Sequence, residues 1–192
     1  MAFEIVVLCS GGGGNLKSIL EQESLSSYVV TSVVTDRACG AEKVAQLFRK
    51  ELERVEVEPA VNFALRLVRA IPPTTRLIVL AGYMPILPPT FIDLSPCPII
   101  NTHPSLLPKY GGRGMYGVRV HQAVIEGEET ETGCTVHIVT EEVDGGPILA
   151  QRKTATRPSE DAWTLGARVF KLEGALLVEV INSLASRVVG DG

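Results

Sequence analysis

The stretch "EIVVLCSGGGGNLKSILEQ" (residues 4–22) gives the clearest indication of the fold. Its apolar, β-branched run over residues 4–10 is typical of a buried strand, and four glycines follow as a turn. Apolar residues at helical spacing then begin after Asn15, which is a favourable residue for a helix start. The stretch therefore predicts a strand, a tight turn and a helix, the opening unit of an α/β sheet.

The rest of the chain continues the alternation of strands and helices. Strands are predicted over residues 28–35, 54–58, 76–82, 97–103, 132–140 and 147–156, and helices over 41–51, 60–71, 116–127 and from near Pro158 onward. Two of the strands are apolar throughout, as in parallel sheets covered on both faces, and the last two strands flank a Gly-Gly turn and predict an antiparallel pair. We predict an open, mostly parallel, twisted α/β sheet of Rossmann-like type with helices on both faces.

Composition limits the class of protein. The 192 residues suit a single domain (1–192), and 45% hydrophobic with 21% charged residues is ordinary for a globular chain. A net charge of −4 argues against non-specific nucleic-acid binding. The opening "MAFEIVVLCS" has no basic start and is too short to span a bilayer, so neither a signal peptide nor a membrane partner is expected. The four cysteines are scattered without metal-ligand spacing, which predicts reduced thiols, no metal and a cytoplasmic location.

The glycine-rich turn is a candidate anion site. Residues 11–14 lead directly into Asn15, so backbone N–H groups and the helix N-terminus can face one ligand. The string matches neither the dinucleotide nor the triphosphate glycine pattern. A single phosphate monoester and a turn that binds nothing both remain open at this point.

An amide and an imidazole end the apolar strand at 97–103. In an extended "NTH" the side chains of Asn101 and His103 project on the same side, where they suit a carbonyl oxygen that becomes anionic in acyl transfer. Asp144, in the turn "EEVDGGPI", is the candidate carboxylate that would raise the pKa of His103 and keep the ring charged. No serine or cysteine stands out as a nucleophile, so the attacking group belongs to the substrate. Structural roles for a strand-end histidine and a turn aspartate are the alternatives.

Glu173 interrupts the apolar face of the last predicted helix. A carboxylate in such a stripe needs a partner or access to solvent. Pairing with a neighbouring arginine and contact with a ligand hydroxyl or ammonium are both possible readings.

Five segments together resemble a known family. "IVVLCSGGGGNLKSIL", "LIVLAGYMPILPP", "IINTHPSLLPKYGG", "GCTVHIVTEEVDGGPILAQ" and "RVFKLEGALL" occur in the order found in phosphoribosylglycinamide formyltransferases, the folate-dependent enzymes of purine synthesis. The resemblance covers nearly the whole chain and implies a formyltransferase fold. It also implies 10-formyltetrahydrofolate as the formyl donor, glycinamide ribonucleotide as the acceptor, and a possible homodimer.

The resemblance also implies roles for particular residues. The catalytic positions are Asn101, His103 and Asp144; the phosphate and ribonucleotide positions are Gly13, Gly14, Asn15, Leu106, Leu107, Pro108, Lys109 and Glu173; the folate positions are Tyr83, Met84, Pro85, Ile86, Leu87, Val139, Glu141, Val143 and again Asp144. In the implied reaction the acceptor amine attacks the formyl carbon, while Asn101 and a protonated His103 hold the oxyanion.

The chain departs from the family pattern in several places. Gly14 stands where the family has Ser or Thr, and three arginines of the family correspond to Val61, Pro85 and Pro98. Replacement positive charge could come from Lys109, Arg113 and Arg119. Two alternatives stay open: another 10-formyltetrahydrofolate-dependent formyltransferase or hydrolase, and a non-catalytic module that binds a phosphate ligand.

Overall fold

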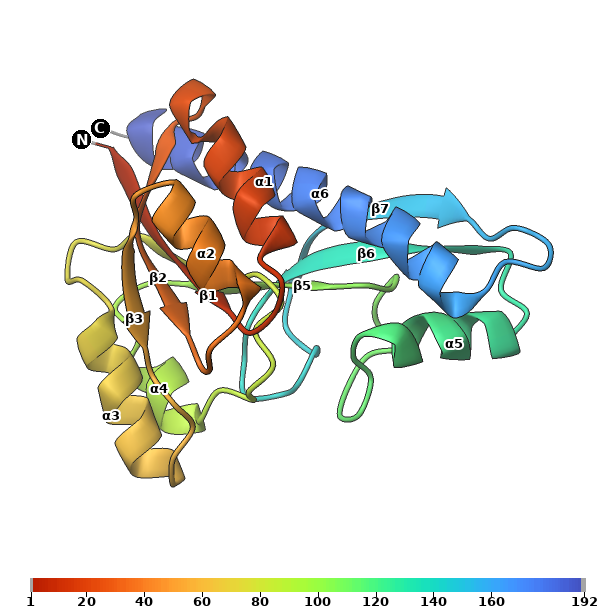
Figure 1. Ribbon diagram of the computed structural model, residues 1–192, viewed down its shortest axis with the longest axis horizontal. Coiled ribbons are helices and arrows are strands. Elements are labelled where there is room, and N and C mark those ends of the chain that lie inside the picture. The colour runs from red at the N-terminus through yellow and green to blue at the C-terminus, as the bar shows by residue number, and fades with distance from the viewer. Residues whose placement is uncertain (1, 191–192) are drawn as a thin grey trace.

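The computed structural model describes residues 2–190 and contains one seven-stranded sheet (Figure 1). The strands are β1 (Phe3–Cys9), β2 (Tyr28–Thr35), β3 (Glu51–Arg54), β4 (Leu77–Leu80), β5 (Ile99–His103), β6 (Glu131–Ile138) and β7 (Ile148–Ala155). Their order across the sheet is β3-β2-β1-β4-β5-β6-β7. The first five pair in parallel, whereas β6 runs antiparallel to both β5 and β7. The predicted mostly parallel sheet with a late antiparallel pair is confirmed.

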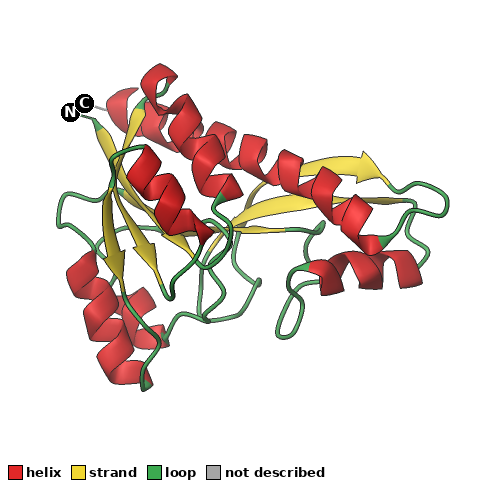
Figure 2. Cartoon of the chain, in the orientation of Figure 1, coloured by secondary structure: helices red, strands yellow, loops and turns green. Residues whose placement is uncertain are grey.

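Helices cover both faces of the parallel part of the sheet (Figure 2). They are α1 (Gly14–Gln22), α2 (Gly40–Leu47), α3 (Ala60–Ala70), α4 (Pro89–Leu94), α5 (Val118–Glu126) and α6 (Ala162–Gly190), with a short 3-10 turn at Glu23–Leu25. Alternation along β1 sends Ile5 and Val7 to the core under α1, α2 and α6, and Val6 and Leu8 to the core under α3 and α4. A strand buried on both faces therefore needs a continuous apolar run.

The largest differences from the sequence predictions concern α2 with β3, α4, and α6. Helix α2 ends at Leu47 because the chain turns at Arg49, whose φ is 55°, and β3 then begins at Glu51 beside Ser32 of β2 rather than at residue 54. Helix α4 was not predicted, because its six residues are too few to show a helical period. Helix α6 begins at Ala162 rather than near residue 158, and the Asp161 carboxylate accepts a hydrogen bond from the Thr164 N–H at 2.8 Å.

The order of the strands places several loops at one edge. Strands β2 and β3 lie on one side of β1, and β4 and the later strands lie on its other side. The strand order therefore reverses at β1. Ligands of open α/β sheets bind beyond the carboxyl ends of the strands at such a reversal. The glycine turn, the Gly82–Leu87 segment and the end of β5 all lie at this edge. Among residues 2–190, no helix combines the length and apolar character needed to cross a membrane.

Candidate active site

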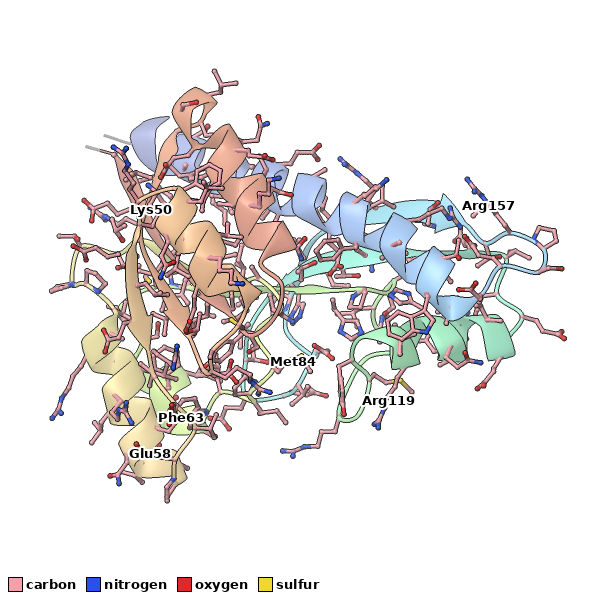
Figure 3. All side chains as sticks on the ribbon, in the orientation of Figure 1. Lys50, Glu58, Phe63, Met84, Arg119 and Arg157 are labelled. Carbon is pink, nitrogen blue, oxygen red and sulfur yellow. The ribbon has the colours of Figure 1, made fainter. Side chains whose placement is uncertain are left out.

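A cavity of about 700 Å³ opens at the carboxyl ends of β1, β4 and β5. Asn15, the 82–87 segment, the β5 residues 101–103, the 112–117 loop, the 139–144 turn and two residues of α6 form its wall. Figure 3 shows Met84 near the middle of the molecule and Arg119 at the start of α5. The volume is in the range of small-molecule ligand sites.

Asn101 lies directly across the sheet from His137 of β6. The Nδ1 of His137 is 2.9 Å from the Ile138 carbonyl oxygen, which can only accept, so this nitrogen carries a hydrogen. The His137 Nε2 is 3.2 Å from the Asn101 Nδ2 and accepts a hydrogen bond from it. This contact fixes the orientation of the amide, and the amide nitrogen of this cavity-lining residue keeps one unused hydrogen.

His103 lies between two oxygen atoms. Its Nε2 donates a hydrogen bond to the Tyr110 carbonyl at 2.8 Å, and its Nδ1 lies 3.4 Å from Asp144 Oδ2. Asp144 Oδ1 lies 3.6 Å from His137 Nε2, so the carboxylate lies between the two imidazoles. The structure thus brings Asn101, His103 and Asp144 together, as the sequence predicted.

The predicted rise in the pKa of His103 is wrong. Burial lowers the pKa of His103 below its ordinary value, and the Asp144 carboxylate and the Tyr110 carbonyl offset only part of this effect. Burial acts to raise the pKa of Asp144, but the adjacent imidazoles of His137 and His103 and the hydrogen bond from the Gly112 N–H together bring it below its usual value. Both directions favour a neutral imidazole beside a carboxylate.

The backbone of two loops holds Asp144 in place. Asp144 has φ 57°, a left-handed conformation that aspartate tolerates in turns, and its Oδ2 accepts a hydrogen bond from the Gly112 N–H at 2.8 Å. Gly112, with φ 90°, belongs to the loop that follows Tyr110. One carboxylate thus joins the 139–144 turn to the loop that also supplies the partner of His103.

The predicted folate positions line the same cavity. Tyr83, Met84, Pro85, Ile86, Leu87, Val139, Glu141 and Val143 all contribute to its wall. The Met84 N–H donates to Ser10 Oγ at 2.8 Å, which ties this segment to the end of β1. Of the cations considered as replacements for the family's arginines, Arg113 lines the cavity, Arg119 stacks 5.0 Å from the centre of the Tyr116 ring, and Lys109 pairs with Glu129. Arg37, which the sequence did not single out, also lines the cavity.

Of the predicted phosphate positions 13–15, Asn15 lines the cavity, whereas Gly13 and Gly14 are not among its lining residues. Gly13 has φ 80° and packs against α2, where a Cβ would lie 2.7 Å from the Ala41 Cα. A Cβ on Gly14 would lie 2.5 Å from Cζ of Phe170. The missing Ser or Thr at position 14 therefore has a physical reason, because an aromatic ring fills the space of that side chain.

Residues 106–109 were predicted to bind the ribonucleotide. None of them lines the large cavity, and Leu106 and Lys109 instead line a smaller one of about 200 Å³. Leu107 is buried, its N–H donates to Thr135 Oγ1 at 3.0 Å, and its carbonyl accepts from Gln151 Nε2 at 2.9 Å. These bonds hold the segment against β6 and β7.

Glu173 projects from α6 into the cavity wall. Its Oε1 accepts a 3.0 Å hydrogen bond from the Thr102 hydroxyl, and in the part of the chain that the structure describes it forms no ion pair. Burial raises the pKa of Glu173 from 4.5 to about 7. Among the described residues no arginine pairs with Glu173, so the first of the two readings is wrong.

Glu173→Gln is expected to stabilise the protein only at higher pH. The raised pKa favours the protonated carboxyl in the folded state, so the stability that it confers is full below pH 4.5 and declines as the pH rises toward about 7. Gln keeps the acceptor for Thr102 without a charge. We expect equal stability at pH 4 and a gain of up to about 3 kcal/mol at pH 8, measured by urea unfolding of both proteins. A gain of the same size at both pH values would contradict this.

Three residues of the site could not be found from the sequence. His137 lies opposite Asn101 only because of the register between β5 and β6, and Phe170 reaches Gly14 only because α6 packs along α1. Tyr110 acts through its backbone carbonyl, which any residue provides. Among the described residues, no group of three or more His, Cys, Asp or Glu side chains is arranged to hold a metal ion.

Comparison with known proteins identifies the family. The Formyl transferase family model matches residues 3–181, which is most of the chain. The chain belongs to the formyl transferase family. A phosphoribosylglycinamide formyltransferase of Haemophilus influenzae is 36% identical over 93% of this chain and 85% of its own length. The chloroplastic phosphoribosylglycinamide formyltransferase of Vigna unguiculata is 37% identical over 94% of this chain, which spans only 60% of that relative.

Solved structures of formyl transferases share the fold. Glycinamide ribonucleotide transformylase 1 from Symbiobacterium toebii superposes with a TM-score of 0.88 at 29% identity, over 96% of this chain and 88% of its own. A phosphoribosylglycinamide formyltransferase from Coxiella burnetii, solved in complex with CHES, also gives a TM-score of 0.88, at 32% identity over 97% of this chain and 88% of its own. This formyl transferase therefore keeps the family fold along almost all of its described length.

Proposed function

We propose that this formyl transferase moves the formyl group of 10-formyltetrahydrofolate to the primary amine of glycinamide ribonucleotide. The observation that supports this most strongly is the convergence of Asn101, His103, His137 and Asp144 at the wall of one large cavity. The names of the relatives agree with the proposed acceptor.

The first step is attack of the amine on the formyl carbon. A carbon–nitrogen bond forms, and the formyl oxygen becomes an oxyanion. The free hydrogen of the Asn101 amide donates to that oxygen, while the bond from the same nitrogen to His137 Nε2 keeps the amide from rotating. A donor fixed before the reaction stabilises the developing charge without reorganisation.

The second part of the reaction is transfer of a proton. The attacking amine loses a hydrogen to the neutral His103 at Nδ1, and the imidazolium that results is stabilised by Asp144 Oδ2 and by the Tyr110 carbonyl on its other nitrogen. The carbon–nitrogen bond to the folate breaks, and its nitrogen takes that proton. In this scheme the low resting pKa of His103 is useful, because a proton acceptor has to start the cycle uncharged.

The remaining parts of the cavity bind the two substrates. The pteridine end of the folate lies among Met84, Leu87 and Val139, in the apolar part of the wall. The acceptor's phosphate lies against the turn before Asn15, where the N-terminus of α1 favours negative charge. Glu173 faces the sugar hydroxyls.

The test is an assay of the purified protein with 10-formyltetrahydrofolate and three acceptors in parallel: glycinamide ribonucleotide, a sugar-nucleotide amine, and water. We expect rapid formylation of the ribonucleotide and hydrolysis slower by about 10²-fold or more, because water lacks the binding interactions that position the amine. Faster transfer to the sugar nucleotide or to water would assign the chain to another branch of the family. No transfer to any acceptor would favour a binding module.

A further inference from the structure

The end of the cavity nearest the glycine turn has an aromatic wall. Phe170 lines the cavity, 46% of it remains exposed, and its ring packs on Gly14 so closely that a Cβ there would lie 2.5 Å from its Cζ. The ring cannot fold away toward the turn, because Gly14 already occupies that side. It therefore presents its outer face to whatever fills this end of the cavity.

Phe170 and Glu173 lie one turn apart on α6 and share a face of the helix. Three residues of helix rise by about 4.5 Å, which is close to the span of one sugar ring. Glu173 is held by the Thr102 hydroxyl through Oε1. Its other oxygen stays available to a ligand in the cavity. Along α6 the cavity thus offers first a flat apolar face and then a hydrogen-bonding carboxyl group.

A buried amide, that of Asn15, also lies at this corner. Asn15 is only 4% exposed and lines the cavity, yet its Oδ1 has no hydrogen-bond partner among the described residues. A buried polar atom without a partner costs free energy unless a ligand or water satisfies it. The Asn15 Oδ1 is covered by α6, where a Cβ on Gly174 would lie 3.4 Å from it, so Glu173 is the group that offers a free oxygen beside the apolar ring.

We propose that Phe170 is a specificity-determining residue whose ring packs against the pentose of the acceptor, between a phosphate at the glycine turn and hydroxyls at Glu173. The inference rests on the proposed function for the identity of the acceptor. The ring covers the carbon-bound face of the sugar and excludes water from it. Gly14 is required for this arrangement, because any larger residue there would displace the ring.

The first test measures binding without the reaction. Ribose 5-phosphate and inorganic phosphate are titrated into the wild type and into Phe170→Ala, and the shifts of the turn amides are followed by NMR. We expect Phe170→Ala to lower the affinity for ribose 5-phosphate about tenfold, because an apolar contact of this size is lost. The affinity for inorganic phosphate should fall less than twofold. Phe170→Leu, which keeps an apolar side chain and adds no atom beyond the position of Cζ, should bind inorganic phosphate like the wild type and lose less affinity for ribose 5-phosphate than Phe170→Ala. An equal loss of affinity for the two probes, or no change in the affinity for either, would overturn the proposal.

The second test is kinetic and uses the coupling between the two residues. Phe170→Ala and Gly14→Ala should each raise the KM for glycinamide ribonucleotide about tenfold and leave the KM for the folate unchanged. The double variant should be no worse than Phe170→Ala alone, because removing the ring makes room for the new Cβ. If the two increases in KM multiply in the double variant, the proposal is contradicted.

Two controls separate this result from other causes. Trp163→Ala removes a 76% exposed aromatic residue of α6 that does not line the cavity, so its KM values should not change. Urea unfolding of each variant checks that the fold is intact. An inactive wild type would refute the proposed function but would leave the ribose 5-phosphate titration as a valid test of Phe170.

Discussion

Asp144→Asn is expected to lower kcat by about 10³-fold or more, because the imidazolium formed at His103 Nδ1 loses its counter-charge. The change is nearly isosteric, and the remaining amide oxygen can still accept the Gly112 N–H. Binding of glycinamide ribonucleotide should therefore survive largely unchanged. Steady-state kinetics and direct titration of the acceptor measure the two quantities separately.

Asp93→Asn is the matched control for this prediction. Asp93 is an exposed carboxylate on α4 that does not line the cavity, so the same chemical change there should leave kcat as it was. The residual activity of Asp144→Asn should also persist to lower pH, because the carboxylate that raised the pKa of His103 is gone. Unchanged turnover in Asp144→Asn would reject the role given to this residue.

Asn101→Ala is expected to reduce kcat by about 10²–10³-fold through loss of one donor to the oxyanion. The substitution also leaves His137 Nε2 without the hydrogen bond that it accepts at 3.2 Å. KM for both substrates should change much less than kcat, because the interaction is made mainly in the transition state. Single-turnover measurements with saturating folate test whether the chemical step itself is slowed.

Asn62→Ala serves as the control for Asn101→Ala, since Asn62 is exposed on α3 and lies outside the cavity wall. A loss of less than tenfold in Asn101→Ala would show that another group donates to the oxyanion. His137→Ala would then be the next variant to measure, because it removes the group that orients the amide.

Much of this protein could be predicted from local patterns. The continuous apolar run of β1, the glycine turn and the helix after it follow from residue types alone, because a strand covered on both faces requires apolar residues at every position. The pair Asn101 and His103 was visible for a similar reason: alternate residues of any strand project on the same side. The quoted motifs also pointed to the correct family.

Tertiary structure decided what lies opposite and around those residues. The register of β5 on β6 places His137 against Asn101, and the packing of α6 along α1 places Phe170 on Gly14. Neither relation leaves a local trace in the sequence, because each depends on segments far apart in the chain. The charge of His103 depended on the fold in the same way, since burial outweighs the carboxylate that the sequence had paired with it. Sequence thus determined which chemical groups are present, and the folded chain determined their neighbours and their protonation.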